Sequence, residues 1–364
     1  MSLTNSADKR ESPALSVRRI RKTFARGSVI AVDNVSLDVW AGEVVSILGP
    51  SGCGKTTTMR IIAGLESPDS GDVLVEGKSI VTLPPHKRRV GLVFQDHALF
   101  PHKTIFENIA FGLRMAGEDR DAIKKRVAVA LELVRLSASK FADRMPSELS
   151  GGERQRVAVA RTIIIEPVVV LFDEPMASLD RRLRDHMAGE LRELQQRLGI
   201  ASLYVTHDQE TASMMSDRIA VMNSGSIVQI GSPIDIYRNP QSRFVANFIG
   251  DTNFLPAKAV RSTSNGAEVE IFGRKIRLER GISGAGERVS LAIRPEDLRV
   301  VTTPGPLALA EGKQISVQFV GGVYVQRVRL TDGSELVARG RVEGYPDQQV
   351  WLEASPDSIR LLRE

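Results

Sequence analysis

The stretch Gly49–Thr56, with the sequence GPSGCGKT, decides the fold of this chain. It matches the pattern G-x-x-x-x-G-K-[ST] and has the flanks that this pattern requires, an apolar run at 44–48 and a helix-forming segment at 57–63. Glycines let successive backbone N–H groups curve around phosphate oxygens at a helix N-terminus, whose dipole favours anions. The stretch therefore predicts a phosphate-binding loop between a strand and a helix of an α/β fold.

The loop residues have expected parts in nucleotide binding. Lys55 is expected to bridge the outer phosphates, and Thr56 is expected to ligate magnesium. The single cysteine, Cys53, excludes an intramolecular disulfide, and we interpret it as a small side chain between two glycines rather than a redox sensor. The expected ATP contacts in this segment are Gly49, Pro50, Ser51, Gly52, Cys53, Gly54, Lys55, Thr56 and Thr57.

Two carboxylates follow the apolar run 168–172, namely Asp173 and Glu174. Ligands of open α/β sheets collect at the carboxyl ends of the strands, and a buried charge there needs a cation. Asp173 fits a magnesium-side carboxylate, and Glu174 fits the group that orients and polarises an attacking water. An exposed turn after a strand is the alternative, and the phosphate loop disfavours it.

The segment LSGGERQR, residues 149–156, precedes apolar residues at helical spacing, so Ser150, Gly151 and Gly152 are expected at a helix start. Backbone N–H groups at such a start could bind an anion. A helix capped by Ser150 would have the same sequence. On these residues alone, the cap is the favoured interpretation.

The length of 364 residues predicts two or three domains. Strand candidates at 43–48, 90–94, 168–172 and 202–206 alternate with helical segments, which indicates a parallel sheet covered by helices. One helix is expected between the last two strands, because Met187, Leu191, Leu194 and Leu198 recur at helical spacing and Gly199 follows.

After residue 250 the pattern changes to short strands with alternating apolar residues, separated by glycine-containing turns. This pattern predicts a second, all-β domain that fits a small barrel. The alternating positions are Val269/Ile271, Ile276/Leu278, Ile315/Val317/Phe319, Val323/Val325, Val328/Leu330 and Val350/Leu352.

Charge and composition argue against a nucleic-acid partner. The net charge of +5 comprises an excess of four in residues 1–250 and one beyond them, so no part carries a concentrated basic field. The basic runs 86–89 and 124–126 lack aromatic neighbours and are interpreted as solvated faces. Residues 1–24 lack a signal-peptide pattern, and no apolar run approaches a bilayer span, so any membrane role is expected to come through a partner.

The phosphate loop, LSGGERQR and LFDEP, in this order and spacing, together resemble the ATP-binding cassette (ABC) ATPases across residues 15–245. The resemblance implies a mostly parallel α/β cassette with a helical subdomain at about 96–160. It also implies roles for four more residues: Gln95 of VFQD as the glutamine loop, Asp180 of SLD as the D-loop, His207 of VTHDQ as the switch histidine, and Phe24 of KTF as the aromatic that stacks on adenine.

In this family two cassettes close head to tail around ATP. The resemblance therefore implies that Ser150, Gly151, Gly152 and Asp180 act on the nucleotide of a second copy, and the anion interpretation replaces the cap. The implied catalytic set is Glu174, His207 and Gln95, and the implied magnesium set is Thr56, Gln95 and Asp173. The sequence departs from the family pattern at Met176 and Ala177, which affects only the expected packing around the D-loop.

The segment 236–255 resembles the domain junction of importer ATPases in the maltose, polyamine and ferric-iron group. That resemblance implies an oligonucleotide/oligosaccharide-type (TOBE-like) β-barrel at 246–364. The segment LAIRPEDL at 291–298 resembles the signature of that domain. Residues 1–14 are expected to form a flexible arm. The segment 99–114 resembles the surface that receives a permease coupling helix. Implied partners are a second copy, two transmembrane permease subunits and, indirectly, an extracytoplasmic solute-binding protein, at the cytoplasmic face of the inner membrane.

DTNFLPA at 251–257 and VRLTDGSELVAR at 328–339 resemble polyamine importers most. Ferric iron, thiamine, phosphonate and sugar importers have similar tails and remain alternatives. A soluble nucleic-acid ABC ATPase is disfavoured, because that class has tandem cassettes or a long coiled-coil insertion. A ligand-sensing regulator is disfavoured because the hydrolysis residues are intact.

Overall fold

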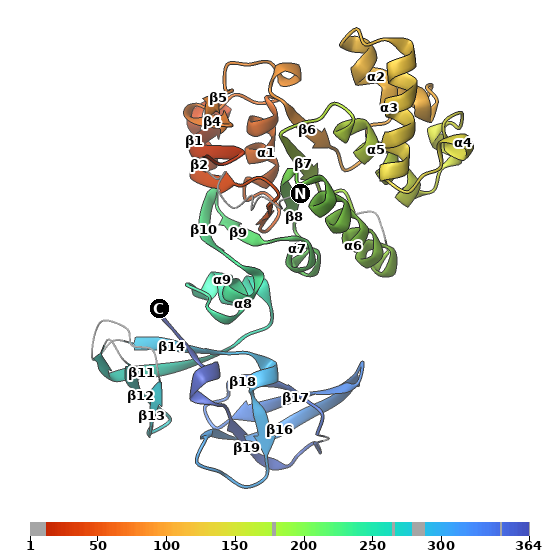
Figure 1. The fold of residues 1–364 in the computed structure, drawn as a ribbon. Coiled ribbons are helices and arrows are strands. Elements are labelled where there is room, and N and C mark those ends of the chain that lie inside the picture. The colour runs from red at the N-terminus through yellow and green to blue at the C-terminus, as the bar shows by residue number, and fades with distance from the viewer. Residues whose placement is uncertain (1–11, 177–179, 264–265, 279–287, 343, 364) are drawn as a thin grey trace, which may run out of the picture. The chain divides into compact units, whose positions relative to one another are not determined.

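The computed structural model describes residues 12–176, 180–263, 266–278, 288–342 and 344–363 (Figure 1). Residues 1–11 of the expected arm at 1–14 lie outside the described residues. Ala177, Ser178 and Leu179 also lie outside them. The chain forms two compact units, one up to Pro233 and one from Ile234. Each unit is described by itself.

A six-stranded sheet forms the centre of the first unit, in the order β10-β9-β3-β8-β7-β6. All neighbours are parallel except β10, which runs antiparallel to β9. The predicted parallel sheet and its four candidate strands are thus confirmed. The strands are β3 (Val44–Leu48), β6 (Val90–Val93), β7 (Val169–Asp173), β8 (Ala201–Thr206), β9 (Arg218–Asn223) and β10 (Ser226–Gly231).

The central strands β3, β7 and β8 are buried on both faces, which is why they consist mostly of apolar residues. In β7, Val169 and Leu171 face one core, whereas Val170 and Phe172 face a second core. Since both sides are covered, the polar groups that follow β7 are confined to the carboxyl edge of the sheet.

A second sheet, antiparallel and in the order β2-β1-β4-β5, covers one face together with α1 (Lys55–Ala63). Ile20 and Val35 from this sheet belong to the same core as Ile47 and Leu203 from the parallel sheet. The sequence pattern did not indicate this sheet. Its strands are β1 (Leu15–Phe24), β2 (Val29–Val39), β4 (Ser70–Val75) and β5 (Lys78–Ser79).

Helices cover the other face of the parallel sheet (Figure 1). The helix predicted before Gly199 is confirmed and spans Arg181–Leu198: Met187, Leu191 and Leu194 are buried, and Gly199 ends it with φ of 62°. The helices are α2 (Ile105–Met115), α3 (Arg120–Leu133), α4 (Ala138–Phe141), α5 (Gly151–Ile163), α6 (Arg181–Leu198) and α7 (Gln209–Met215).

The expectation that residues 86–89 form a solvated face is wrong at Arg88, which is only 4% exposed. Its guanidinium donates hydrogen bonds to the carbonyl oxygens of Ile61 and Ile62, at the end of α1, and also to those of Val81 and Leu83. These carbonyls replace water around the charge, because unpaired helix-terminal carbonyls are good acceptors for a cation. Arg88 is therefore the cap of the α1 C-terminus.

The second unit contains the short helices α8 (Pro233–Arg238) and α9 (Arg243–Ile249) and two antiparallel sheets around one apolar core, which confirms an all-β domain. One sheet contains β11 (Asn253–Thr263), β12 (Gly266–Ile271), β13 (Arg274–Leu278), β14 (Arg288–Ile293) and β20 (Arg360–Arg363). The other contains β15 (Arg299–Val301), β16 (Ala308–Val320), β17 (Val323–Leu330), β18 (Glu335–Gly340) and β19 (Gln349–Glu353). Single 3-10 turns lie at Ala25–Gly27, Pro85–Lys87, Pro146–Glu148, Pro295–Asp297 and Pro356–Ser358.

In β16 the alternating apolar residues Ile315, Val317 and Phe319 do not form the buried face of the strand. The strand pairing shifts register between Gln314 and Ser316, so Gln314 points into the interior and donates a hydrogen bond to Gln326, while Phe319 is 66% exposed. A β-bulge re-aims the residues beyond it, and local alternation carries no sign of the shift.

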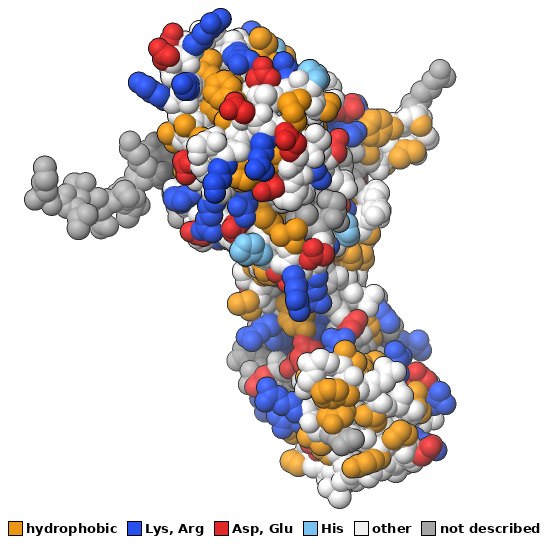
Figure 2. All heavy atoms as spheres, turned by 90° about the vertical axis from the view of Figure 1, so that its right-hand side faces the viewer, with side chains coloured by type: hydrophobic (Ala, Val, Ile, Leu, Met, Phe, Trp, Pro, Cys, Tyr) orange, Lys and Arg blue, Asp and Glu red, His pale blue; other side chains and the backbone are white. Residues whose placement is uncertain are grey.

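Lys and Arg alternate with Asp and Glu over the face shown in Figure 2, without a uniformly basic area there. Across the described residues, every helix is too short or too polar to cross a bilayer.

Candidate functional site

The loop Gly49–Thr56 joins β3 to α1 and has two positions where neighbouring backbone leaves no room for a side chain. At Gly54, φ is 106° and a Cβ atom would lie 2.2 Å from the Ala31 carbonyl oxygen; at Gly49 it would lie 2.3 Å from the Met222 carbonyl oxygen. Bare backbone therefore lines the loop directly before the N-terminus of α1. Such a cradle fits a phosphate chain, since its N–H groups can be approached closely.

Lys55 is buried over this loop. Its Nζ donates hydrogen bonds to the carbonyl oxygens of Gly49 and Pro50, at 2.8 and 2.9 Å. Phosphate oxygens entering the loop would compete with these carbonyls for the ammonium, which already lies against the loop. Cys53 is also buried, and burial raises the pKa of its thiol although Lys55 opposes the shift.

Glu174 and His207 meet at the carboxyl edge of the sheet, because β7 and β8 are neighbours. Oε2 of Glu174 and Nδ1 of His207 are 3.0 Å apart. Glu174 has a left-handed φ of 42°, and its N–H donates to the Val205 carbonyl oxygen. This hydrogen bond fixes a strained backbone, a feature common at functional sites. The pair therefore has a defined geometry, in which Oε2 of Glu174 contacts His207 and Oε1 does not take part in that contact.

Asp173 is the second carboxylate at this edge. Burial raises its pKa, and Glu174 raises it further, whereas Arg60 and Lys55 oppose the shift. A half-buried carboxylate that is costly to ionise suits a site where a cation arrives with its ligand. Thr56, which follows Lys55 and is half-buried, supplies a hydroxyl from the same end of the sheet.

These donors fit a magnesium ion, because hydroxyl, carboxylate and amide oxygens are its preferred ligands. The amide would come from Gln95, which is exposed in the loop after β6, the strand beside β7. Nowhere in the described chain do three or more His, Cys, Asp or Glu side chains cluster. Phosphate and water oxygens would therefore have to complete the coordination.

Phe24 is not a core residue, since it is 40% exposed at the end of β1 with Lys22 Nζ 5.3 Å from its ring centre. It pairs with Val29 of β2. Val29 and Ile30 are exposed apolar residues, and the next residue, Ala31, lies against Gly54. Phe24 and Val29 are direct partners across the two strands and so lie on one face, whereas Ile30 lies on the other. Phe24 and Val29 can form an apolar platform for a base beside the loop. Sequence reasoning missed Val29, although an exposed apolar residue at the start of a strand is a usable signal.

Ser150 caps α5. Its Oγ accepts a hydrogen bond from the Glu153 N–H at 3.3 Å, and Glu153 accepts from the Ser150 N–H at 2.8 Å, so the cap interpretation holds within the single chain. Gly152 has room for a Cβ atom, with the nearest atom, Sδ of Met187, at 3.6 Å. The chain's own packing thus does not demand glycine there. Asp180 caps α6 in the same manner, accepting from the Leu183 N–H.

The structure brings Lys55, Asp173, Glu174 and His207 to one edge of the sheet, but it does not bring Ser150 to them. Among the described residues, no hydrogen bond or ion pair joins Ser150–Gly152 to the loop Gly49–Thr56. The α5 start is exposed at Ser150 and half-buried at the two glycines. It is therefore accessible to another molecule.

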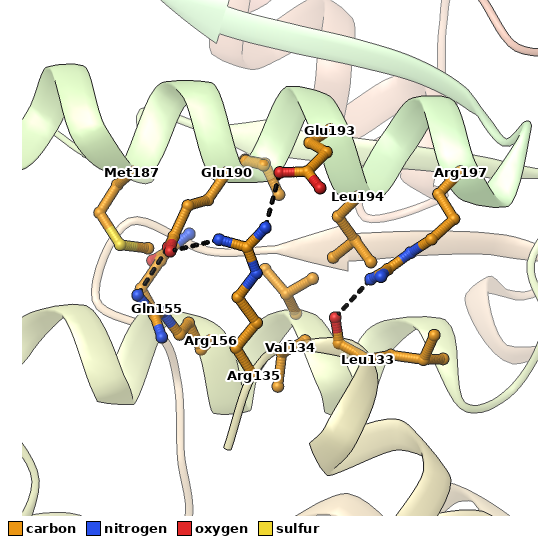
Figure 3. Close-up of a pocket in the computed structure, with 12 residues that line it drawn as sticks. Leu133, Val134, Arg135, Gln155, Arg156, Met187, Glu190, Glu193, Leu194 and Arg197 are labelled. Atoms are coloured by element: carbon orange, nitrogen blue, oxygen red, sulfur yellow. Dashed lines mark hydrogen bonds and ion pairs between the residues drawn. The ribbon is translucent and has the colours of Figure 1, made fainter.

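A cavity between α5 and α6 is not a nucleotide site. It has a volume of about 30 Å³, which holds one or two waters. Figure 3 shows Arg135 closing it through ion pairs with Glu190 and Glu193, while Arg197 donates to the Leu133 carbonyl oxygen. The cavity belongs to the packing of the helices.

Two family models match the chain: "ABC transporter" at residues 32–177 and "TOBE domain" at residues 291–362. The spermidine/putrescine import ATP-binding protein PotA of Desulfitobacterium hafniense is 44% identical over 96% of this chain and 97% of its own length. The protein of the same name from Rubrobacter xylanophilus is 45% identical over 93% of this chain and 91% of its own length.

Solved structures similar to the chain include cbiO1 of Clostridium perfringens, part of the ABC transporter complex cbiONQ. It has 31% identity and a TM-score of 0.58, and the match covers 62% of this chain and 91% of that one. A dimeric post-hydrolysis state of the ATP-binding cassette MJ0796, bound to ADP and Pi, has 31% identity and a TM-score of 0.54. That match covers 60% of this chain and 98% of the other.

Proposed function

The chain belongs to the ABC transporter ATPases, and from this premise we propose that it hydrolyses ATP to energise a membrane importer of polyamines, specifically spermidine and putrescine. The observation that carries the proposal is 44–45% identity, over nine tenths of the chain or more, to proteins named for spermidine/putrescine import. The intact loop, carboxylates and histidine support the hydrolytic part.

ATP would bind with its phosphates in the loop Gly49–Thr56, where Lys55 exchanges its loop carbonyls for phosphate oxygens. Phe24 would stack on adenine at the exposed platform beside that loop. Thr56, Gln95 and Asp173 would hold Mg²⁺, which when bound neutralises phosphate charge. Burial of Asp173 supports this assignment, because ionisation there is favoured by a cation.

Glu174 would orient the attacking water and accept its proton. Oε2 of Glu174 faces His207, so Oε1 is left for the water. His207 is more exposed than Glu174, with 58% against 21% of its side chain accessible, so it can also reach the γ-phosphate. Gln95 would sense the nucleotide from the loop after β6. In this proposal Glu174 is the base, His207 is a positioning residue, and the amide of Gln95 lies near the terminal phosphate.

A second copy would complete the site in a head-to-tail dimer. Ser150, Gly151 and Gly152 form an accessible helix start with space at Gly152, and the dipole of α5 favours an anion there. Asp180, exposed at the start of α6, would lie at the same interface. The similarity to dimeric cassettes of known structure supports this arrangement.

The permease would contact the segment 99–114, at the cytoplasmic face of the inner membrane. Within it, Ile105 and Ile109 are core residues, whereas Phe111 is exposed and packs 4.8 Å from the ring of Phe100. Exposed aromatic rings beside a core are suited to receive an apolar helix. An extracytoplasmic solute-binding protein would act through the permease, without touching this chain.

Uptake measurements test the substrate. Cells that lack this chain, complemented with the wild-type or the Glu174→Gln form, would be given labelled putrescine, spermidine and ferric iron. We expect polyamine uptake to depend on the wild-type form and ferric iron uptake to be unchanged. Undiminished uptake of both polyamines in the cells without the chain would refute the substrate, and loss of ferric iron uptake alone would favour that alternative.

A further inference from the structure

Two ion pairs join the first turn of α6 to the start of α7. Nη1 of Arg184 lies 2.7 Å from Oδ2 of Asp208, and both side chains are only 26% exposed. Nη2 of Arg181 lies 2.8 Å from Oε2 of Glu210, and these side chains are 75% and 64% exposed. A partly buried pair restricts its two elements more strongly than an exposed pair, because water competes less for its charges. The Arg184–Asp208 pair is therefore the stronger link.

Asp208, the residue after His207, accepts hydrogen bonds with both of its carboxylate oxygens. Oδ1 accepts the Thr211 N–H at 2.6 Å and so caps α7, while Oδ2 accepts from Arg184. Its own N–H donates to Oγ1 of Thr206 at 2.9 Å. His207 lies between Thr206 and Asp208, so these contacts fix the backbone on both sides of the histidine. An exposed side chain such as His207 would otherwise have rotational freedom relative to Glu174.

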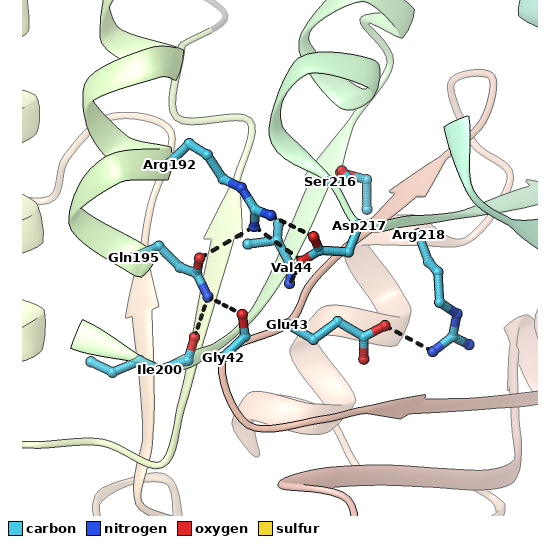
Figure 4. Close-up of polar contacts among 10 residues, drawn as sticks. Gly42, Glu43, Val44, Arg192, Gln195, Ile200, Ser216, Asp217 and Arg218 are labelled. Carbon is cyan, nitrogen blue, oxygen red and sulfur yellow. Dashed lines mark hydrogen bonds and ion pairs between the residues drawn. The ribbon is translucent and has the colours of Figure 1, made fainter. Parts of the chain in front are cut away.

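The other half of α6 is anchored to the central sheet. Figure 4 shows Arg192 bound to Asp217, at 2.5 Å, and Gln195 donating to the carbonyl oxygens of Gly42 and Ile200. Asp217 in turn accepts the Val44 N–H at the start of β3. Because its C-terminal half is fixed in this way, α6 presents Arg184 to Asp208 from a rigid support.

We propose that Arg184 is a positioning residue for ATP hydrolysis, which acts through Asp208 to hold His207 against Glu174. The proposal rests on the proposed function and deepens it. Since α6 begins directly after Asp180, a second copy that contacts Asp180 would act on the same turn that carries Arg184. The ion pair is thus the route by which the first turn of α6 affects the His207–Glu174 pair.

The test compares Arg184→Met, Arg184→Lys and Asp208→Asn with Arg181→Ala in the purified full-length chain, by phosphate release over a range of ATP concentrations. Asp208→Asn keeps an acceptor for the Thr211 N–H, so it removes the ionic link while keeping the cap. Arg181→Ala removes the neighbouring exposed pair and is the matched control.

We expect Arg184→Met and Asp208→Asn to lower kcat by about 10- to 100-fold, as small misplacements of catalytic groups do, and to leave KM for ATP within about twofold. Arg184→Lys should recover most of the loss, and Arg181→Ala should keep wild-type kcat. The double variant Arg184→Met/Asp208→Asn should be no slower than the slower single variant, because both changes break one interaction.

Three results would overturn the inference: wild-type kcat in Asp208→Asn, an Arg181→Ala defect as large as that of Arg184→Met, or additive losses in the double variant. If Arg184→Met does not fold, Asp208→Asn and Arg184→Lys decide the question by the same criteria. The Glu174→Gln form separates this inference from the function beneath it. Multiple turnovers by Glu174→Gln would refute the proposed hydrolysis, whereas inactive Glu174→Gln with normal Asp208→Asn would refute only the role of Arg184.

Discussion

Replacing Arg88 with Met is expected to destabilise the first unit strongly, although Arg88 lies in a run of four basic residues. The guanidinium makes four hydrogen bonds to backbone carbonyls, at 2.7–3.1 Å, and is 4% exposed. Losing each bond costs about 1 kcal/mol, since the carbonyl keeps its desolvation without its partner, which gives about 4 kcal/mol. Release of the buried charge offsets part of this, so the expected loss is about 3 kcal/mol.

For a unit of this size, a loss of about 3 kcal/mol lowers the unfolding midpoint by roughly 6–12 °C. The assay is thermal unfolding of the full chain, followed by calorimetry, with the transition of the first unit compared between variants. Arg89→Met is the matched control: its ion pair with Glu76 is exposed and contributes less than about 0.5 kcal/mol. A midpoint for Arg88→Met within 2 °C of that of Arg89→Met, roughly the shift of a neutral surface change, would refute the capping role.

Three further changes address the nucleotide site. Lys55→Ala should abolish measurable ATP binding in a fluorescent-nucleotide titration, and near-normal affinity would contradict the role of its ammonium. Phe24→Ala should weaken ATP binding by about tenfold with kcat unchanged, since stacking on an aromatic ring contributes about 1–3 kcal/mol, and unchanged affinity would remove Phe24 from the base platform. Alkylation of Cys53 should inhibit hydrolysis, with ATP protecting. Because burial raises the pKa of the thiol, its alkylation should reach half its maximal rate at a higher pH than that of a free thiol; full activity after stoichiometric labelling would contradict the prediction.

The parallel sheet could be predicted because its information is local. Each of β3, β6, β7 and β8 is a short apolar run buried on both faces, and the phosphate-loop pattern fixes the order strand, loop and helix around β3. The end of α6 could be predicted for the same reason, since Gly199 takes the left-handed conformation that ends a helix.

The antiparallel sheet could not be predicted in this way. β1 forms a hairpin with β2, but it also pairs with β4 through contacts that are distant in sequence, and the register shifts within both pairings. The burial of Arg88 depends on carbonyls 5 to 27 residues away, so its local sequence, three basic neighbours, suggests the wrong environment. The bulge at Gln314 likewise depends on the partner strand β17.

In the candidate site, too, some residues could be predicted from the order of strands, whereas others are placed by tertiary contacts. Asp173 is the last residue of β7, and Glu174 and His207 directly follow β7 and β8, so their approach follows from strand order once these two strands are neighbours. The exposed residue Val29 is placed beside the candidate site only through the contact of Ala31 with Gly54, a tertiary contact without a local pattern.

The most direct test of the account is the behaviour of Glu174→Gln in the purified chain. The carboxylate is proposed as the base for water, whereas ATP binding depends on the loop and Lys55, which this change does not touch. The account predicts that Glu174→Gln binds ATP with wild-type affinity and releases no phosphate beyond a single turnover. Multiple turnovers by this variant would contradict it.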